Sequence, residues 1–265
     1  MRFLLIATLL ALLAACAQVQ ERNPLATWVP SPNYEARRPI LIVLHATEQQ
    51  SVQRSLDTLR TRNSGGPVSA HYLIGRDGEL FQLVADEQRA WHAGAGRWGT
   101  ITDINSVSIG IELDNDGAAE FPQAQIDSLL RLLTDLCDRL RIPRTQIVAH
   151  AEFAPTRKSD PGPQFPWRTL AQAGFGAWPP DDALPAPQGF DPWLALRLVG
   201  YPLQDRAATV RAFHRRYRGT ETDALDAEDL RILHALTRLP GATRQPVDAP
   251  AAPAGALTEP GGTRP

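Results

Sequence analysis

Two histidines in this chain each follow a segment that is predicted to be a buried β-strand. His45 comes directly after the apolar run 40–44, and His150 comes directly after the short run 146–149. Because a sheet holds its strand ends rigidly, the two imidazoles are well placed to converge, and Asp160 could join them from the following loop. Two imidazoles and one carboxylate are a common ligand set for catalytic zinc, with the fourth tetrahedral position left to water. The spacing alone is not specific, since a histidine at a strand end is more often a hydrogen-bonded structural residue.

A glutamate lies inside another predicted strand, 107–113. Isoleucines occupy one face of this strand, and Gly110 and Glu112 occupy the other. A carboxylate in a buried strand is costly unless something compensates it, and catalysis is one such reason. Glu112 could take a proton from an attacking water and pass it to a leaving nitrogen. The alternative is that Glu112 lies on the solvent face of an edge strand.

The chain contains one lysine, Lys158, and every other basic residue except histidine is arginine. Hydrolysis of an amide builds negative charge on the carbonyl oxygen, and a positive group held at that point stabilises the transition state. Lysine is a compact point charge, whereas arginine is a broad planar fork, so a crowded metal site favours lysine. We therefore interpret Lys158 as an oxyanion-stabilising group. The alternative is that it is a chance lysine on a solvated loop.

The elements that would position these residues mix strands with helices. Residues 68–74 and 79–84 flank the turn sequence 75–78 and predict a hairpin. Apolar residues recur at helical spacing in 52–59 and in 124–141. Cys137 lies on the apolar stripe of the second helix, so we interpret it as a core residue and not as a nucleophile or ligand. The order of elements predicts an α/β domain with a central mixed β-sheet flanked by helices, over residues 39–175.

A second, smaller unit is predicted after a Pro- and Gly-rich linker, 176–192. Three short helical patterns follow in 193–239, and Asp226 is a reasonable N-cap for the last. His214 and His234 lie on apolar stripes, which favours packing over metal binding. Residues 240–265 are rich in Pro, Gly, Ala and Thr, which predicts a disordered tail.

The start of the chain is typical of a secreted protein. Residues 1–15 have a short positive start and an apolar run, and they predict a signal peptide. Small residues precede Cys16 with the spacing of a lipoprotein cleavage site, which predicts acylation of Cys16. Ala17, and not Asp, follows the cysteine, which predicts a place on the outer membrane facing the periplasm. The polar, proline-containing stretch that follows predicts a tether over 16–38. An ordinary cleaved signal peptide is the alternative. The net charge of −2 argues against a nucleic-acid partner.

Several motifs occur in an order that resembles a known family. These are His45 after its strand, the segments 68–74, 91–94 and 106–112, and the loop 150–167 with Lys158 and Asp160. Together they resemble the zinc-dependent N-acetylmuramoyl-L-alanine amidases, the type 2 amidase family, which is related to the peptidoglycan recognition proteins. Residues 193–239 look like a three-helix peptidoglycan-binding domain, and the leader and this module resemble those of the outer-membrane lipoprotein amidases.

The resemblance implies one zinc ion on His45, His150 and Asp160, with Glu112 and Lys158 catalytic. It implies peptidoglycan and muropeptides as substrates, cleaved between N-acetylmuramic acid and L-alanine, by a protein expected to be monomeric. His71 and His92 could contact the substrate, or they could be satisfied core histidines. Two other classes stay open: a non-catalytic peptidoglycan-binding protein of the same fold, and a zinc peptidase that acts within the stem peptide.

Overall fold

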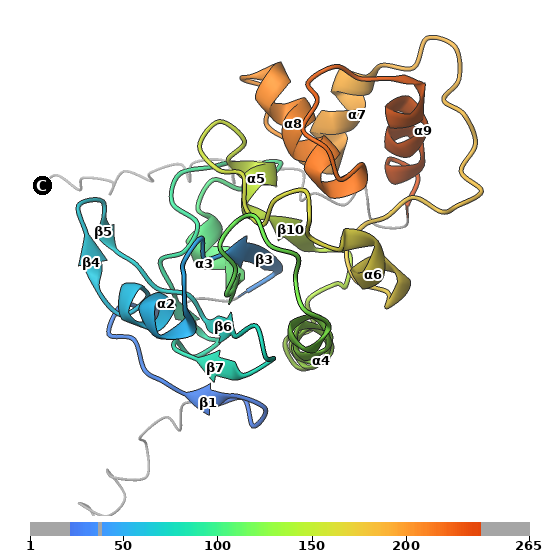
Figure 1. The fold of residues 1–265 in the computed structure, drawn as a ribbon. Helices are drawn as coiled ribbons and strands as arrows, with labels where there is room; N and C mark the ends of the chain where they lie inside the picture. Colours follow the sequence, from blue (N-terminus) through green and yellow to red (C-terminus); the bar gives the residue numbers. More distant parts are fainter. Residues whose placement is uncertain (1–21, 37–38, 240–265) are drawn as a thin grey trace, which may run out of the picture.

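The computed structural model describes residues 22–36 and 39–239 (Figure 1). The predicted signal peptide, the predicted acylation site at Cys16 and the predicted tail 240–265 lie outside these residues. Within the described part, the main sheet has six strands in the order β1-β7-β6-β9-β3-β10. Their bounds are β1 Thr27–Trp28, β3 Leu41–Ala46, β6 Tyr72–Ile74, β7 Leu80–Gln82, β9 Ser108–Leu113 and β10 Ile147–Ala149. The sheet is mixed, because β6 and β7 form an antiparallel hairpin while β6, β9, β3 and β10 run parallel.

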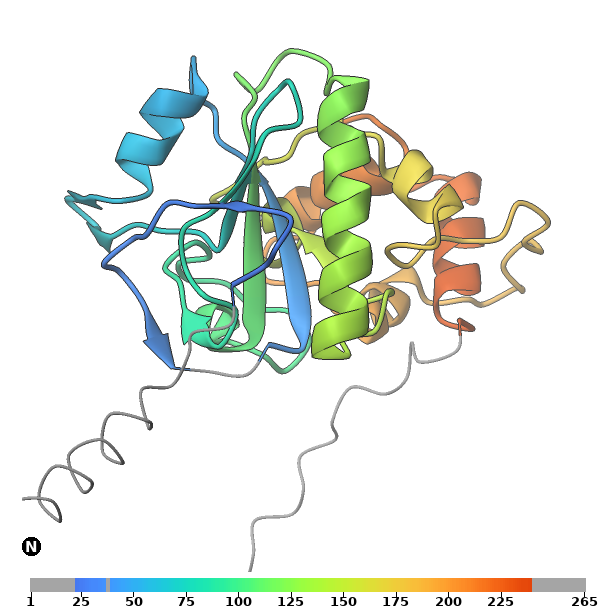
Figure 2. The same ribbon diagram turned by 90° about the horizontal axis from the view of Figure 1, so that it is seen from below.

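One face of the sheet is covered by the long helix α4 (Gln123–Leu140), as Figure 2 makes plain. Alternate strand residues such as Ile42, Leu44 and Ile111 pack into one apolar cluster with the leucines of α4. Cys137 is buried in this cluster, which confirms its interpretation as a core residue. The helix ends at Arg141, which adopts a left-handed conformation with φ 56°. Because successive side chains of a strand point to opposite faces, the remaining side chains of β3, β9 and β10 lie on the other face of the sheet.

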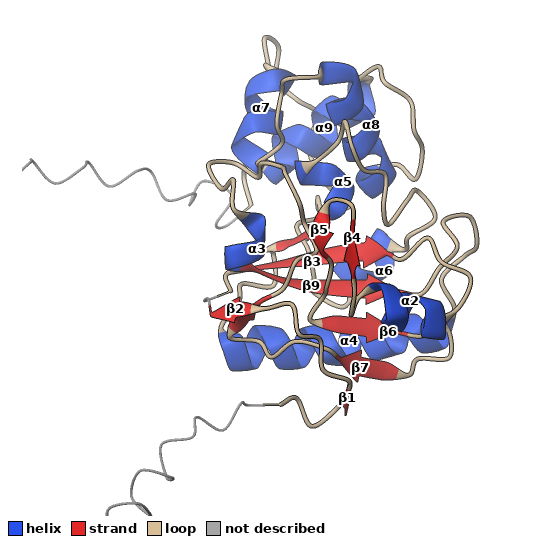
Figure 3. Ribbon diagram, turned by 90° about the vertical axis from the view of Figure 1, so that its left-hand side faces the viewer, coloured by secondary structure: helices blue, strands red, loops and turns tan. Residues whose placement is uncertain are grey.

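The opposite face carries three C-terminal helices, α7 (Pro192–Val199), α8 (Arg206–Tyr217) and α9 (Ala227–Leu236). The sequence predicts these helices and the N-cap Asp226, whose side chain accepts a hydrogen bond from the backbone of Asp229. These helices, predicted as a small unit after a linker, pack directly against the sheet. Strand residues such as Val43 share one apolar cluster with helix residues such as Phe213, so the helices form a third layer (Figure 3).

The N-terminal segment also differs from the predicted tether. Strand β1 pairs with the edge strand β7, and Asn23 is buried, with its backbone N–H donating to the side chain of Gln82. A second strand, β2 (Glu35–Ala36), pairs with β8 (Gln88–Arg89). Residues 22–36 are therefore part of the folded domain. Isolated two-residue strands leave no periodicity in a sequence, which is why the sequence did not indicate them.

The remaining elements are short and lie around the strand ends. They are α2 (Val52–Thr58), the hairpin β4 (Arg62–Asn63) and β5 (Gly66–Pro67), α3 (Ile104–Val107), α5 (His150–Phe153) and α6 (Trp167–Gln172). Helix α2 begins at the N-cap Ser51, whose hydroxyl accepts from the backbone of Arg54. Among the described residues no helix is long and apolar enough to cross a membrane.

Candidate metal centre and active site

Strand register brings the predicted site residues together. His45 is the register partner of Glu112 in the parallel pair β3–β9, so the two side chains lie side by side on one face of the sheet. His150 begins α5 directly after β10, which pairs with β3 on its other side. All three side chains lie on the face opposite α4. The two histidines meet as the sequence predicts, although His45 lies within β3, one residue before its end, and not directly after the strand.

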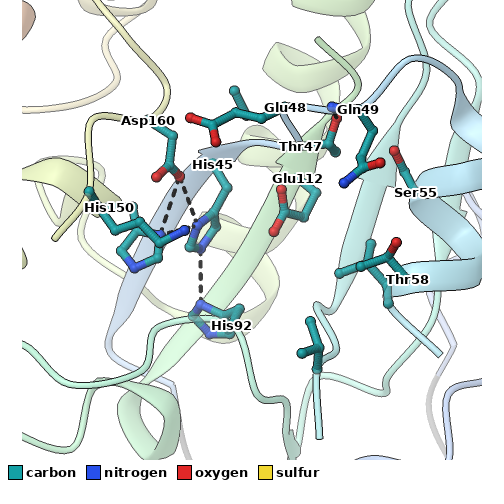
Figure 4. Close-up of a pocket in the computed structure, with 14 residues that line it drawn as sticks. His45, Thr47, Glu48, Gln49, Ser55, Thr58, His92, Glu112, His150 and Asp160 are labelled. Atoms are coloured by element: carbon teal, nitrogen blue, oxygen red, sulfur yellow. Dashed lines mark hydrogen bonds and ion pairs between the residues drawn. The ribbon is translucent and has the colours of Figure 1, made fainter. Parts of the chain in front are cut away.

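Three donor atoms converge at this point: Nδ1 of His45, Nδ1 of His150 and Oδ2 of Asp160 (Figure 4). The two nitrogens lie 2.9 Å apart, and Oδ2 lies 3.2 Å from the first and 3.3 Å from the second. A tetrahedral zinc ion with bonds of about 2.0–2.1 Å requires ligand atoms about 3.3 Å apart. The triangle therefore fits a zinc ion in size, and its donors are of the type that zinc prefers.

The charge states of His45 and Asp160 also suit a cation. Burial, and then the neighbouring His150, lower the pKa of His45 to about 4. Burial opposes charge on Asp160, but His150 and His45 hold the pKa of that carboxyl well below its usual range. Oδ1 of Asp160 has no hydrogen-bond partner among the described residues. At neutral pH the site therefore presents an uncharged His45 imidazole beside an incompletely satisfied carboxylate, which is the state that binds a divalent ion.

Glu112 and Lys158 line the same pocket as the three donors, which encloses about 180 Å³. Burial, and then the charge of Asp160, raise the pKa of Glu112 to about 8, while Lys158 acts in the opposite direction. A carboxyl with a pKa near neutrality can both accept and return a proton. Glu112 is not on the solvent face of an edge strand, because β9 lies between β6 and β3. The structure brings both predicted catalytic side chains to the candidate metal centre.

The far wall of the pocket includes residues that sequence reasoning missed. They come from the loop after β3 and from α2, as Figure 4 shows: Thr47, Glu48, Gln49, Ser55 and Thr58. No motif or periodicity marks these polar residues. For Thr47, Glu48 and Gln49 the available signal was their position just after His45, and Ser55 and Thr58 carried no signal beyond lying in a predicted helix.

His71 and His92 have different surroundings, and only one of them lines the pocket. His71 is fully buried, its Nδ1 accepts from the backbone N–H of Gly110, its Nε2 donates to the carbonyl of Gln88, and it is not among the pocket residues. This favours the structural alternative for His71 over a substrate contact. His92 does line the pocket, and its Nδ1 lies 3.0 Å from Nε2 of His45. His214 is buried and bonded to Asp229, in agreement with a packing role.

Comparison with known proteins agrees with this geometry. The sequence pattern of the N-acetylmuramoyl-L-alanine amidase family matches residues 35–163. The chain is 42% identical over 156 residues to the N-acetylmuramoyl-L-alanine amidase AmiD of Escherichia coli, covering 52% of this chain and 54% of that protein. It is 35% identical over 158 residues to the 1,6-anhydro-N-acetylmuramyl-L-alanine amidase AmpD of Citrobacter freundii, covering 52% of this chain and 84% of that one.

A solved structure extends the similarity beyond the amidase region. E. coli AmiD in complex with the substrate anhydro-N-acetylmuramic acid-L-Ala-D-gamma-Glu-L-Lys matches with a TM-score of 0.66 and 32% identity. The match covers 84% of this chain and 92% of that chain, whereas the sequence alignment with AmiD spans about half of the length of that protein. The mixed sheet flanked by helices is thus confirmed as the fold. With its sequence pattern, its relatives and its fold in agreement, the chain belongs to the N-acetylmuramoyl-L-alanine amidase family.

Proposed function

We propose that this protein is a zinc-dependent hydrolase that cleaves the amide between N-acetylmuramic acid, or its anhydro form, and L-alanine in peptidoglycan or muropeptides. The observation that carries the proposal is the meeting of three zinc-type donor atoms with Glu112 and Lys158 in one pocket. The relatives support the choice of bond, since they are named as amidases of this linkage, and the AmiD complex contains a muropeptide substrate.

His45, His150 and Asp160 would hold the zinc ion through Nδ1, Nδ1 and Oδ2. When bound there, zinc would supply Lewis acidity that polarises the carbonyl and makes a water molecule more acidic. The donor set suits a catalytic site, because three protein ligands leave a coordination position free.

The chain's own side chains would carry out the proton transfers. Glu112 accepts a proton from the water that attacks the lactyl carbonyl carbon, and the new C–O bond turns the carbonyl oxygen into an oxyanion. The Lys158 ammonium stabilises this oxyanion. Glu112 then gives its proton to the alanine nitrogen as the C–N bond breaks. The products are a muramic acid carboxylate and a free peptide that begins with L-alanine.

Mass spectrometry of a defined muramoyl-tripeptide tests the proposal. Residues 18–265 are incubated with the substrate alone, with a zinc chelator, and as the Glu112→Gln variant. A free tripeptide beginning in L-alanine, absent in both controls, is the expected result. Alanine still attached to muramic acid would indicate a peptidase. Intact substrate with zinc bound would indicate a non-catalytic binding protein.

We also propose a lipid anchor on Cys16 that holds the protein on the outer membrane, facing the periplasm. The support is the sequence pattern before Cys16, with small residues at the positions of a lipoprotein cleavage site. Two or more acyl chains give stable membrane attachment. Labelling cells with a radioactive fatty acid tests this, with Cys16→Ser as the control. Label retained by the Cys16→Ser variant would contradict the anchor.

A further inference from the structure

We propose that the segment His92–Ala93 sets the tautomer of both histidine ligands, and that His92 is a positioning residue for His45. This inference rests on the proposed function, because it assigns a role toward the same metal. It replaces the expectation that His92 contacts the substrate. Two consecutive residues of one loop reach the outer nitrogen of each imidazole: Nδ1 of His92 meets Nε2 of His45, and the carbonyl of Ala93 meets Nε2 of His150.

On the His45 side, hydrogen bonds run from His45 to His92 and on to Ser108, and the direction of each one follows from Ser108. Oγ of Ser108 lies 2.6 Å from the carbonyl of Ile104, which can only accept, so the hydroxyl hydrogen is used there. Oγ can therefore only accept from Nε2 of His92, 3.2 Å away. A neutral His92 with its hydrogen on Nε2 has a bare Nδ1, which accepts from Nε2–H of His45 at 3.0 Å. The lone pair of His45 is thereby left on Nδ1, the atom that faces the other two donors.

The His150 side reaches the same result by a shorter path. Nε2 of His150 lies 2.9 Å from the carbonyl of Ala93, which can only accept, and 3.3 Å from Nη2 of Arg157, which can only donate. The shorter contact assigns the hydrogen to Nε2 and the lone pair to Nδ1. The guanidinium of Arg157 also donates to this carbonyl, at 2.6 Å, and to the carbonyl of Ala95, at 2.7 Å. Arg157 therefore ties the loop of Ala93 to the chain segment that follows His150.

The loop is itself held in place by buried contacts. Oδ1 of Asn105, which is buried, accepts from the backbone N–H of His92 at 3.1 Å and of Ala93 at 2.9 Å. The ring of His92 lies directly over β9 at Gly110, where a Cβ atom would come within 2.4 Å of Cγ of the ring. Any larger residue at position 110 would displace His92. A glycine in the middle of a strand thus has a defined role here.

Outer partners of this kind orient a ligand imidazole, and their loss typically costs about 10–100-fold in metal affinity. The test is zinc affinity, measured by competition with a chromophoric chelator, together with the steady-state kinetics on the muramoyl-tripeptide at saturating zinc. For His92→Ala we expect the zinc Kd to rise about 10–100-fold while KM stays within about threefold. His92→Asn should recover most of the affinity, because Asn places an acceptor oxygen near the position of Nδ1. His234→Ala, on α9 away from the site, is the matched control and should leave the zinc Kd unchanged.

A substrate contact would give the opposite pattern. An unchanged zinc Kd with a raised KM in His92→Ala overturns the inference, and so does an unchanged zinc Kd with an unchanged KM. If His92→Ala does not fold, judged by circular dichroism, Ser108→Ala decides. It removes the acceptor of the His92 ring hydrogen, so the zinc Kd should rise several-fold, and an unchanged value overturns the inference. Zinc affinity needs no turnover, so a parent protein that binds zinc but hydrolyses nothing would contradict the proposed function alone.

Discussion

Two buried carboxylates lie close to His150 in the sequence, and their charges are compensated in different ways. Glu152 accepts from the backbone N–H of Ala149, from the hydroxyl of Tyr201, and from the guanidinium of Arg216 at 2.8 Å. Asp160 faces two imidazoles, and in the described part of the chain no ion pair joins it to an arginine or lysine. Both oxygens of Glu152 are hydrogen-bonded, and an arginine pairs with its carboxylate. Oδ1 of Asp160 has no partner among the described residues, and its Oδ2 faces only the two imidazoles.

This difference separates a structural charge cluster from a functional one. Buried charges are tolerated when they are paired and hydrogen-bonded. A buried carboxylate that lacks such partners therefore favours a site that binds a cation. The Glu152 cluster also explains the place of the C-terminal helices. Arg216 belongs to α8 and also donates to the carbonyl of Ile147 in β10, so α8 holds the strand that leads into His150.

The largest expected effect comes from removing the carboxylate that needs the cation. Asp160→Ala should lose stoichiometric zinc and lower kcat/KM by at least about 1,000-fold, because one of three ligands is gone. Zinc should raise the melting temperature of the parent and leave that of the variant unchanged, since only a bound ligand stabilises the folded state. Metal analysis and thermal melts check this. A variant that keeps one zinc ion per chain would place the metal elsewhere.

Glu112→Gln should separate chemistry from metal binding. Glutamine has the shape of glutamate but cannot accept the proton, so kcat should fall by roughly 10²–10⁴-fold while zinc stays bound. Steady-state kinetics and metal content on the same samples measure both. If the zinc content fell with the activity, Glu112 would have to be counted among the groups that hold the metal.

Lys158→Ala should lower kcat by roughly 100-fold or more, because the developing oxyanion loses a positive partner. Lys158→Arg keeps the charge but changes its shape, and we expect only partial recovery in the crowded pocket. The zinc content should match that of the parent in both variants. Full activity in Lys158→Ala would return Lys158 to the alternative of a chance lysine on the loop.

A substitution in the Glu152 cluster should lower the stability of the protein and leave its metal content unchanged. Arg216→Met removes the cation that pairs with buried Glu152, and breaking a buried pair in this way costs about 3–5 kcal/mol of unfolding free energy. The double variant Arg216→Met with Glu152→Gln should recover part of that loss. Urea unfolding measures both, and zinc stoichiometry of the folded fraction is the control. A small effect of Arg216→Met would mean that α8 is not held by this pair.

The smallest effect is a change of stability with pH in the metal-free protein. The pKa of Glu112 is about 8 in the folded state against an ordinary value of 4.5. Between these values the folded state keeps a proton that the unfolded state has released, so the stability of the parent falls as pH rises. Glu112→Gln lacks this titration. Its advantage over the parent should grow by on the order of 1–3 kcal/mol from pH 5 to pH 8. Parallel pH dependence in the two proteins would contradict the raised pKa.

Much of the site could be predicted because strands carry simple rules. Alternation along β3 and β9 puts His45 and Glu112 on one face, and the strand ends bring His150 beside them. The contact between His92 and His45 could not be predicted, because a loop residue reaches its partner through tertiary packing and leaves no period in the sequence. Only Gly110, a glycine within a strand, carried a signal that something approaches closely there.

The C-terminal helices illustrate the same limit on a larger scale. Their bounds follow from apolar periodicity and from caps such as Asp226. Their docking against the sheet combines a shared apolar cluster with the pair of Arg216 and Glu152, two residues 64 positions apart that no spacing rule connects. The Pro- and Gly-rich segment before them was predicted to be a linker between two units. Composition alone does not reveal that the helices after this segment pack against the sheet before it.

The central claim is that His45, His150 and Asp160 hold one zinc ion. Anomalous X-ray diffraction on crystals of the zinc-loaded protein, recorded on both sides of the zinc absorption edge, tests it directly. We predict one strong peak at about 2.0–2.2 Å from Nδ1 of His45, Nδ1 of His150 and Oδ2 of Asp160. A zinc peak away from these three atoms, or none in crystals of protein that carries one zinc ion per chain in solution, would contradict the account.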